Sequence, residues 1–196
     1  MIAVIDYDMG NLRSLENALG RLGAQCIVTA DPDVILKADR VILPGVGHAG
    51  KAMENLESRG LPGIIRSLRQ PVLGICVGMQ VLCRDSEEAP GVPCMGIFDA
   101  HVRHFTAAPG RKVPHMGWND LSNMEGKLLK DVPRNSYVYF VHSYYAGTCP
   151  DTVATCNYDG VLFSAALRYE NFYGTQFHPE KSGLAGEQIL KNFLAL

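Results

Sequence analysis

The strongest constraint on the fold is the alternation of short apolar and amphipathic segments in the first half of the chain. Four short apolar runs predict buried strands, at residues 2–7, 25–29, 41–43 and 71–76. Residues 11–22 carry leucines at helical spacing, and Gly23 follows them as a helix-terminating glycine. Alternation of this kind predicts parallel strands with helices on both faces of the sheet.

The rest of the chain has a different pattern. Residues 53–68 are mostly helical in character with an interruption near 60–63, a further helix is expected over 78–84, and 85–93 are a polar loop. Six β-like segments follow, some expected to pair antiparallel, at residues 98–105, 113–121, 137–145, 152–158, 163–169 and 172–177. Residues 183–196 predict a closing helix. We therefore expect an α/β fold, with an open, mixed, mainly parallel sheet flanked by helices and an added β-rich portion in the second half.

Size and charge narrow the class of protein. A chain of 196 residues with 47% hydrophobic residues suits one globular domain, residues 1–196. Its 18 basic and 20 acidic residues give a net charge of -2, which predicts no general attraction to nucleic acid or to a membrane surface. We see no signal peptide and no apolar run long enough to span a bilayer, so we expect a cytoplasmic protein whose six cysteines are free thiols.

One cysteine stands apart from the other five. Cys76 ends an apolar run and is flanked by Gly74 and Gly78, after which a helix is expected. Small neighbours permit a sharp strand-to-helix turn that exposes a nucleophile, and the helix N-terminus favours the thiolate. The N–H of Val77 follows the sulfur and is a candidate oxyanion donor. An ordinary strand–turn–helix with glycines for packing is the competing interpretation.

A thiolate nucleophile requires a base, and His178 is the best candidate. It follows an apolar run and precedes Pro179, which predicts an extended backbone at His178. On an extended segment Glu180 points to the same side as His178 and orients the imidazole, as the third member of a triad does. A solvated lead-in to the last helix is the alternative.

Cys76 and His178 both follow predicted strands, whose carboxyl ends meet at one edge of an open α/β sheet, where ligand sites form. Residues 44–47, Pro-Gly-Val-Gly, follow a third strand and supply a candidate second oxyanion donor at Gly47. A bare turn is the alternative for this short segment.

Taken together, the segments Gly-Ile-Cys-Val-Gly-Met-Gln (74–80) and Gln-Phe-His-Pro-Glu (176–180) resemble the class I, or triad, glutamine amidotransferases, over effectively the whole chain. Further motifs resemble the glutaminase subunits of imidazole glycerol phosphate synthases within that family. They are residues 7–11, 44–47, 114–119, 139–144 and 181–183. Val77 departs from the leucine that is commoner after the nucleophile, but only its backbone is needed.

The resemblance implies a flavodoxin-like fold and a mechanism. In it, Cys76 attacks the side-chain amide of glutamine, His178 transfers protons, and Glu180 supports His178. Backbone N–H groups near Gly47 and Val77 hold the oxyanion. Three further residues would bind the substrate: Gln80, Ser143 and Tyr144.

The resemblance also implies a partner, because ammonia released into water at neutral pH is mostly protonated and a poor nucleophile. That partner would be a (β/α)8-barrel cyclase subunit in a heterodimer, which uses the ammonia to make imidazole glycerol phosphate and an aminoimidazole carboxamide ribonucleotide. Asn11, Trp118 and Lys181 match interface positions, although a lone Trp is more often a core or rim residue. The resemblance implies no cofactor.

Other classes of function remain open at this point. A glutaminase subunit of pyridoxal phosphate synthase is the nearest alternative, and a cysteine peptidase or chaperone of related architecture would share the elbow. A module that only binds would be expected to lack Cys76, His178 or Glu180. A metal site at His101 and His104 is disfavoured, because residues three apart on a strand face opposite ways.

Overall fold

The computed structural model describes all 196 residues, and its largest element is a seven-stranded sheet. Its strands are β1 (Ile2–Ile5), β2 (Cys26–Thr29), β3 (Arg40–Leu43), β4 (Val72–Ile75), β10 (Thr152–Tyr158), β11 (Val161–Tyr169) and β12 (Phe172–Thr175). They lie in the order β10-β11-β12-β4-β3-β1-β2. The pairs from β4 to β2 are parallel, as is β4 with β12, whereas β10–β11 and β11–β12 are antiparallel. The predicted mixed, mainly parallel sheet is therefore confirmed.

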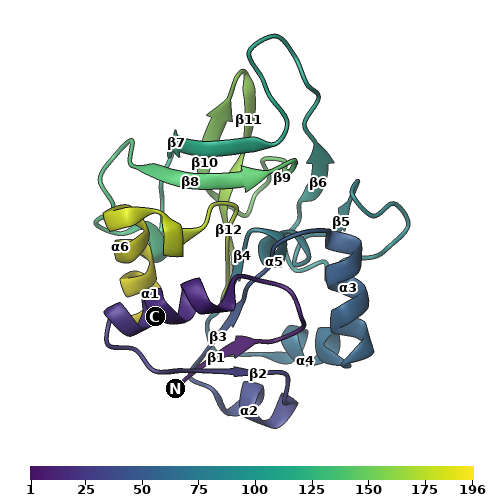
Figure 1. Cartoon of the computed structure of the whole chain (residues 1–196), viewed down its shortest axis with the longest axis vertical. Helices are drawn as coiled ribbons and strands as arrows, with labels where there is room; N and C mark the ends of the chain where they lie inside the picture. Colours follow the sequence, from purple (N-terminus) through teal and green to yellow (C-terminus); the bar gives the residue numbers. More distant parts are fainter.

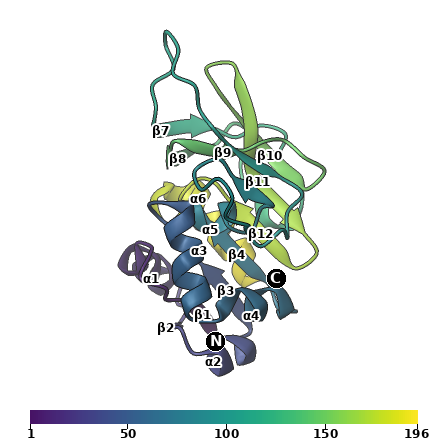
Figure 2. The same ribbon diagram turned by 90° about the vertical axis from the view of Figure 1, so that its right-hand side faces the viewer.

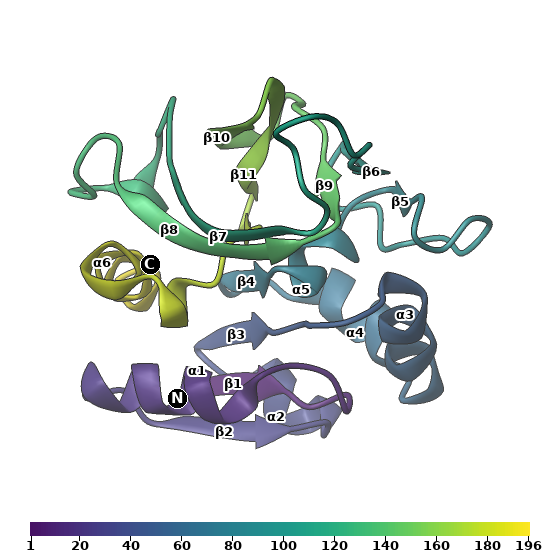
Figure 3. The same ribbon diagram turned by 45° about the horizontal axis from the view of Figure 1, so that its top comes forward.

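Helices cover both faces of this sheet, as expected (Figures 1 and 3). They are α1 (Leu12–Arg21), α2 (Pro32–Lys37), α3 (Ala49–Ser58), α4 (Leu61–Ser67), α5 (Val77–Gln80) and α6 (Gly183–Leu194), with 3-10 turns η1 (Lys127–Leu129) and η2 (Pro179–Lys181). Contacts join α1 and α6 to η2 on one face, and join α2 and α3 to α4 on the other. The buried side of α1 consists of Leu15, Ala18 and Leu19, the helical spacing seen in the sequence.

Two smaller sheets lie beyond the carboxyl ends of the parallel strands (Figures 1 and 2). One pairs β7 (His115–Asp120) antiparallel with β8 (Tyr137–His142). The other combines β5 (Asp85–Ser86), β6 (His101–His104) and β9 (Tyr144–Ala146). A backbone hydrogen bond of 3.0 Å from His178 N to Tyr139 O ties the β7–β8 pair to the chain that leaves β12. The β-rich portion therefore covers the sheet edge where the site was expected.

Several element boundaries differ from the sequence expectations. The structure contains α2, which was not predicted, and the helix expected over 53–68 begins at Ala49 and is interrupted at Arg59 and Gly60. Gly60 has φ +67, a left-handed conformation that glycine adopts without strain, whereas Gly63 lies inside α4. The helix expected over 78–84 is shorter, because the N–H groups of Leu82 and Cys83 bond three residues back and tighten the turn.

Element boundaries in the second half of the chain also differ from those expected from the sequence. The segment 137–145 is not one strand but two, since β8 ends at His142 and β9 begins at Tyr144. The loop expected over 85–93 contains the short strand β5. No helix of the structure is both long enough and apolar enough to cross a membrane.

Candidate active site

Cys76 sits at a sharp turn between β4 and α5. Its φ of 53° and ψ of -112° are strained for a residue with a side chain. This is the expected elbow conformation, and the surrounding structure enforces it. Because α5 begins at Val77, the N–H of Val77 belongs to a first helical turn that has no carbonyl of its own helix to bond. Cys76 and Val77 both line one cavity at the edge of the sheet.

Glycines make this turn sterically possible. A Cβ at Gly78 would lie 2.0 Å from the carbonyl oxygen of Leu43, and one at Gly74 would lie 2.8 Å from the oxygen of Gly78. A Cβ at Gly45 would lie 2.4 Å from the nitrogen of Gly78. The Pro-Gly-Val-Gly segment and the elbow therefore touch through their backbones, which brings two oxyanion candidates to one place.

His178 and Glu180 meet beside Cys76. Nδ1 of His178 lies 2.8 Å from Oε1 of Glu180, and their side chains are 2% and 4% exposed. The prediction that residues 178–180 are extended was wrong beyond His178, because Pro179–Lys181 forms the 3-10 turn η2. Proline suits the first position of such a turn, and the turn itself folds the carboxylate onto the imidazole. Neither side chain is solvated, so the lead-in alternative does not describe them.

The electrostatics of His178 follow from these neighbours. Burial by itself lowers the pKa of His178, but the proximity of Cys76 and the carboxylate of Glu180 outweigh burial and raise the pKa to about 10. Its Nε2 is buried without a hydrogen-bond partner, and so is Oε2 of Glu180. An unpaired imidazole nitrogen next to a thiol, with its other nitrogen held by a carboxylate, is suited to exchanging protons with a reacting group.

The sulfur opens into a cavity of about 140 Å³. This is below the roughly 300–1,000 Å³ of sites for drug-sized ligands, and it suits a small molecule. The predicted residues that line it are Gly47, Cys76, Val77, Gln80, Ser143, Tyr144 and His178. A larger hollow of about 580 Å³, lined by residues between Leu121 and Asn135, contains no cysteine, histidine or carboxylate. The chemistry therefore points to the smaller cavity.

Two polar residues at this cavity were not predicted to belong to the site, Gln176 and Glu88. Gln176 is fully buried, and its Nε2 lies 3.7 Å from the sulfur of Cys76. Glu88 brings a carboxylate to the cavity wall, where Oε2 accepts the N–H of Ala49 at 2.7 Å. Gln176 stands in the quoted 176–180 motif, which was a usable signal, whereas Glu88 lies in the segment interpreted as a loop.

The predicted substrate residues have distinct surroundings. Gln80 is buried, and its Nε2 donates to the carbonyl of Tyr144 at 2.8 Å and to Oε1 of Gln176 at 3.0 Å. Ser143 lies between β8 and β9, where its carbonyl accepts the N–H of Phe105 at 3.0 Å. Gln80 thus braces the backbone of Tyr144 from inside the protein.

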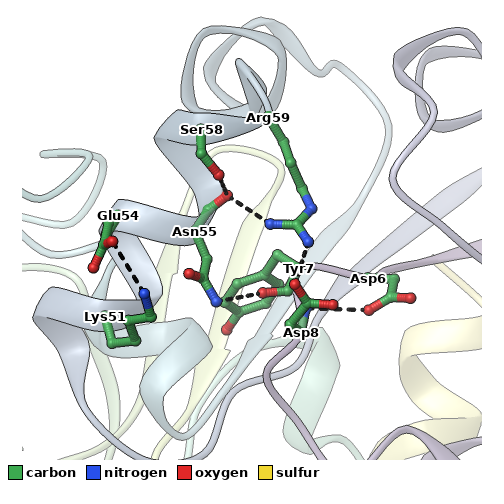
Figure 4. A network of polar contacts seen from close by, with 8 residues as sticks. All are labelled: Asp6, Tyr7, Asp8, Lys51, Glu54, Asn55, Ser58 and Arg59. Atoms are coloured by element: carbon green, nitrogen blue, oxygen red, sulfur yellow. Dashed lines mark hydrogen bonds and ion pairs between the residues drawn. The ribbon is translucent and has the colours of Figure 1, made fainter.

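The segment 44–47 is held by the loop that follows β1. The hydroxyl of Tyr7 donates to the carbonyl of Pro44 at 2.5 Å, and Tyr7 is fully buried. Figure 4 shows how α3 secures this loop: Nδ2 of Asn55 donates to the carbonyl of Tyr7 at 2.9 Å, and Arg59 forms an ion pair with Asp8. Gly47 has φ +92, so a residue with a side chain would be strained there.

The three predicted interface residues lie at the same end of the molecule. Asn11 caps α1, since its Oδ1 accepts the N–H of Ser14 at 3.3 Å. Trp118 is 54% exposed, and Nζ of Lys181 lies 5.9 Å from the ring centroid of Tyr139. Trp118 is therefore not a core residue.

Known proteins resemble this chain over nearly its whole length. The glutamine amidotransferase class-I family model matches residues 3–196. The solved structure of a glutamine amidotransferase superimposes with a TM-score of 0.76 at 20% identity, and covers 100% of this chain and 98% of that one. A glutamine amidotransferase from Thermotoga maritima gives a TM-score of 0.63 at 18% identity, with 99% of this chain and 82% of that one covered. These two structures support the fold.

Curated relatives are much closer in sequence. An imidazole glycerol phosphate synthase subunit HisH from Bacteroides fragilis is 54% identical over 100% of this chain and 99% of its own length. The HisH subunit from Escherichia coli is 47% identical over the same shares. The chain therefore belongs to the class I glutamine amidotransferases and, within them, to the HisH subunits of imidazole glycerol phosphate synthases.

Proposed function

We propose that this chain, acting as one amidotransferase domain over residues 1–196, hydrolyses L-glutamine to glutamate and ammonia. The proposal assigns Cys76, His178 and Glu180 to catalysis. The observation that carries it is the strained Cys76 on a small cavity, beside a buried imidazole whose other nitrogen is held by a carboxylate. A chain of the class I amidotransferase family with this arrangement has the groups that amide hydrolysis requires.

The chemistry runs in two halves. The thiolate of Cys76 attacks the side-chain amide carbon and forms a tetrahedral intermediate, whose oxyanion lies near the N–H groups of Gly47 and Val77. His178 protonates the departing nitrogen, ammonia leaves, and a glutamyl thioester remains. Water, deprotonated by His178, then attacks the thioester and releases glutamate and the thiolate. Glu180 keeps the imidazole in one orientation and stabilises its cation.

Recognition of the amino-acid end uses the opposite wall of the cavity. We assign Ser143 and Tyr144 to this end, with Gln80 as the brace behind them. The carboxylate of Glu88 offers a counter-charge for the α-ammonium group. The remaining oxygen of Gln80, Oε1, accepts no hydrogen bond from the protein and is free for substrate.

The ammonia requires a receiving protein. We propose a heterodimer with a (β/α)8-barrel cyclase that converts it into imidazole glycerol phosphate and an aminoimidazole carboxamide ribonucleotide, in the cytoplasm. Support comes from an exposed apolar face on β7 and β8, where Met116, Trp118 and Tyr137 are 63%, 54% and 60% exposed. Asn11 and Lys181 border the same end and complete the proposed contact. Neither a cofactor nor a metal enters this scheme.

The experiment replaces the nucleophile in the presence of the cyclase subunit. Cys76→Ala is expected to abolish glutamate release and glutamine-dependent synthesis, while synthesis from added ammonium salt continues at the wild-type rate. Cys94→Ala is the matched control, because Cys94 is similarly buried but does not line the cavity. Glutamine use that survives Cys76→Ala would contradict the assignment.

A further inference from the structure

The proposed chemistry leaves two buried histidines unused: His142, which lines the glutamine cavity, and His115, which is hydrogen-bonded to His142. His115 begins β7, His142 ends β8, and the two are cross-strand partners. They are 3% and 6% exposed. No carboxylate hydrogen-bonds either ring, and the surroundings are aromatic: Phe105, Phe140, Tyr158 and Phe163. Such an environment disfavours charge on both imidazoles.

The hydrogen bonds of the two rings fix where their protons are. Nδ1 of His142 lies 2.8 Å from the carbonyl oxygen of Tyr144, which only accepts, so Nδ1 carries the proton. A neutral His142 then accepts at Nε2, and Nδ1 of His115 donates to it at 2.9 Å. Nε2 of His115 is left as an acceptor and faces the amide nitrogen of Asn119 at 3.4 Å. Both rings are therefore Nδ1–H tautomers, and the hydrogen bonds point in one direction, from His115 to His142 to the carbonyl of Tyr144.

This series of hydrogen bonds ends at Tyr144, which lines the cavity. The carbonyl of Tyr144 receives one hydrogen bond from His142 and a second from Nε2 of Gln80, each 2.8 Å long. Gln80 is bonded in turn to Gln176, which reaches the sulfur of Cys76. The peptide that follows Tyr144 is thus held by two buried donors, one from the nucleophile side and one from the β7–β8 side.

Protonation of His142 would break the hydrogen bond between the two histidines. If His142 were protonated, its Nε2–H would point at the Nδ1–H of His115, and two donors would face each other. Burial prevents this by lowering the pKa of His115 to about 4 and that of His142 to about 3. The pair therefore remains neutral across the whole range in which a cytoplasmic enzyme works.

We propose that His142 and His115 are positioning residues for glutamine: as a neutral Nδ1–H relay they orient the Tyr144 peptide that contacts the amino-acid end of the substrate. The inference rests on the proposed function, because it assumes that Ser143 and Tyr144 bind glutamine. Neither histidine touches the reacting amide, so their effect falls on substrate binding and not on the chemical step.

The test measures glutaminase kinetics with the cyclase subunit present. His142→Leu removes both hydrogen bonds of the ring. It is expected to raise KM for glutamine about 10-fold, because a buried carbonyl that loses a hydrogen-bond donor weakens binding by about that factor. The value of kcat is expected to change little. His142→Asn keeps a donor at the Nδ1 position and is expected to recover most of the wild-type KM. Alkylation of Cys76 by iodoacetamide is expected to be unchanged in both variants, because this reagent lacks the amino-acid end.

Phe163→Leu is the matched control, because Phe163 packs on both imidazoles without hydrogen-bonding either. It is expected to lower stability but to leave KM unchanged. An unchanged KM in His142→Leu would overturn the inference, and so would an equal rise in all three variants, which would indicate packing alone. A wild-type complex that does not hydrolyse glutamine would overturn the proposed function and this inference with it.

Nitrogen NMR of the wild-type complex provides a readout that does not depend on a folded variant. At neutral pH both rings are expected to show the shifts of neutral imidazole with the proton on Nδ1. Either ring observed as the cation or as the Nε2–H tautomer would overturn the proposal.

Discussion

The protein contains two buried side-chain pairs that include histidine, one histidine–carboxylate and one histidine–histidine, and their electrostatics are opposite. Nδ1 of His178 lies 2.8 Å from Oε1 of Glu180, and Nδ1 of His115 lies 2.9 Å from Nε2 of His142. The pKa of His178 is raised to about 10, whereas those of His115 and His142 are lowered to about 4 and about 3. Burial disfavours the cation in all three rings, so burial cannot explain the difference.

The difference lies in what each ring faces. His178 has a carboxylate on one side and Cys76 on the other, and these overcome the cost of burial. His115 stacks on Tyr158 and Phe140, with ring centroids 3.9 Å and 4.8 Å away, and receives no negative charge. One pair is therefore equipped to exchange protons and the other to hold a fixed hydrogen-bond direction. Three experiments test this contrast.

The largest expected effect comes from removing the charge of the first pair. Glu180→Gln keeps the shape of the side chain but no longer favours the imidazolium, so the pKa of His178 falls. We expect kcat for glutamine hydrolysis to drop by roughly 10⁴-fold, as for triads that lose their carboxylate. The readouts are steady-state glutamate release and a pH titration of His178 by NMR.

Glu187→Gln is the control for this experiment, because Glu187 is an exposed carboxylate on α6 that pairs with Lys191. It is expected to retain wild-type kcat. A Glu180→Gln variant with undiminished kcat would show that the charge beside His178 has no catalytic part.

A second experiment uses the acid side of the stability curve. The folded-state pKa values of His115 and His142 lie below the ordinary value near 6.5, so the unfolded chain binds more protons between about pH 4 and 6.5. The free energy of unfolding therefore falls as pH is lowered through this window, by roughly 1 kcal/mol per pH unit for each histidine. His178 adds nothing here, because its raised pKa stabilises the fold below 6.5 and that contribution is lost as pH rises toward 10.

Urea unfolding at several pH values measures this slope. The double variant His115→Phe, His142→Leu is expected to have a shallower slope than wild type, whereas Ser136→Ala, which removes a hydroxyl that does not titrate, keeps the wild-type slope. Equal slopes in the wild type and the double variant would mean that the second pair is not held neutral.

The smallest expected effect concerns the backbone that carries His178. The buried hydroxyl of Ser182 donates to the carbonyl of His178 at 2.6 Å and accepts the N–H of Tyr139 at 3.0 Å. Ser182→Ala leaves that N–H without its partner, so we expect a loss of about 1–2 kcal/mol in the free energy of unfolding, with a minor change in kcat. Ser136→Ala, which removes an exposed hydroxyl bonded to Pro133, is expected to change stability little. A large fall in kcat for Ser182→Ala would show that His178 depends on Ser182 for its orientation.

The two pairs also differ in how far the sequence revealed them. His178 and Glu180 are separated by one proline, so their meeting is a local property and was predicted, although the backbone between them is a 3-10 turn and not a strand. His115 and His142 lie 27 positions apart, and their contact depends on the register of β7 against β8. That register places His142 opposite His115, and nothing local in either segment specifies it.

The cavity residues also divide into those placed by local sequence and those placed by contacts between distant segments. The elbow at Cys76 follows from glycines within two positions, because close backbone approach needs residues without a Cβ. Gln176 meets Gln80 across 96 positions, and Glu88 reaches the cavity from a loop. The contact between Gln176 and Gln80 forms only when β4 and β12 pair side by side, and Glu88 is held at the cavity by its bond to the N–H of Ala49.

The parallel sheet, the turn at Cys76 and the local His178–Glu180 contact can all be predicted from the sequence, because each follows from short-range periodicity, glycine placement or neighbouring side chains. Long-range contacts settle which side chains close the cavity, which carbonyl the second pair holds, and why the pKa of His178 is raised while those of His115 and His142 are lowered. The physical reason is that a pKa and a hydrogen-bond direction depend on groups brought together from distant strands. Burial lowers the local dielectric constant, so neighbouring charges and dipoles act more strongly on the histidines than they would in water.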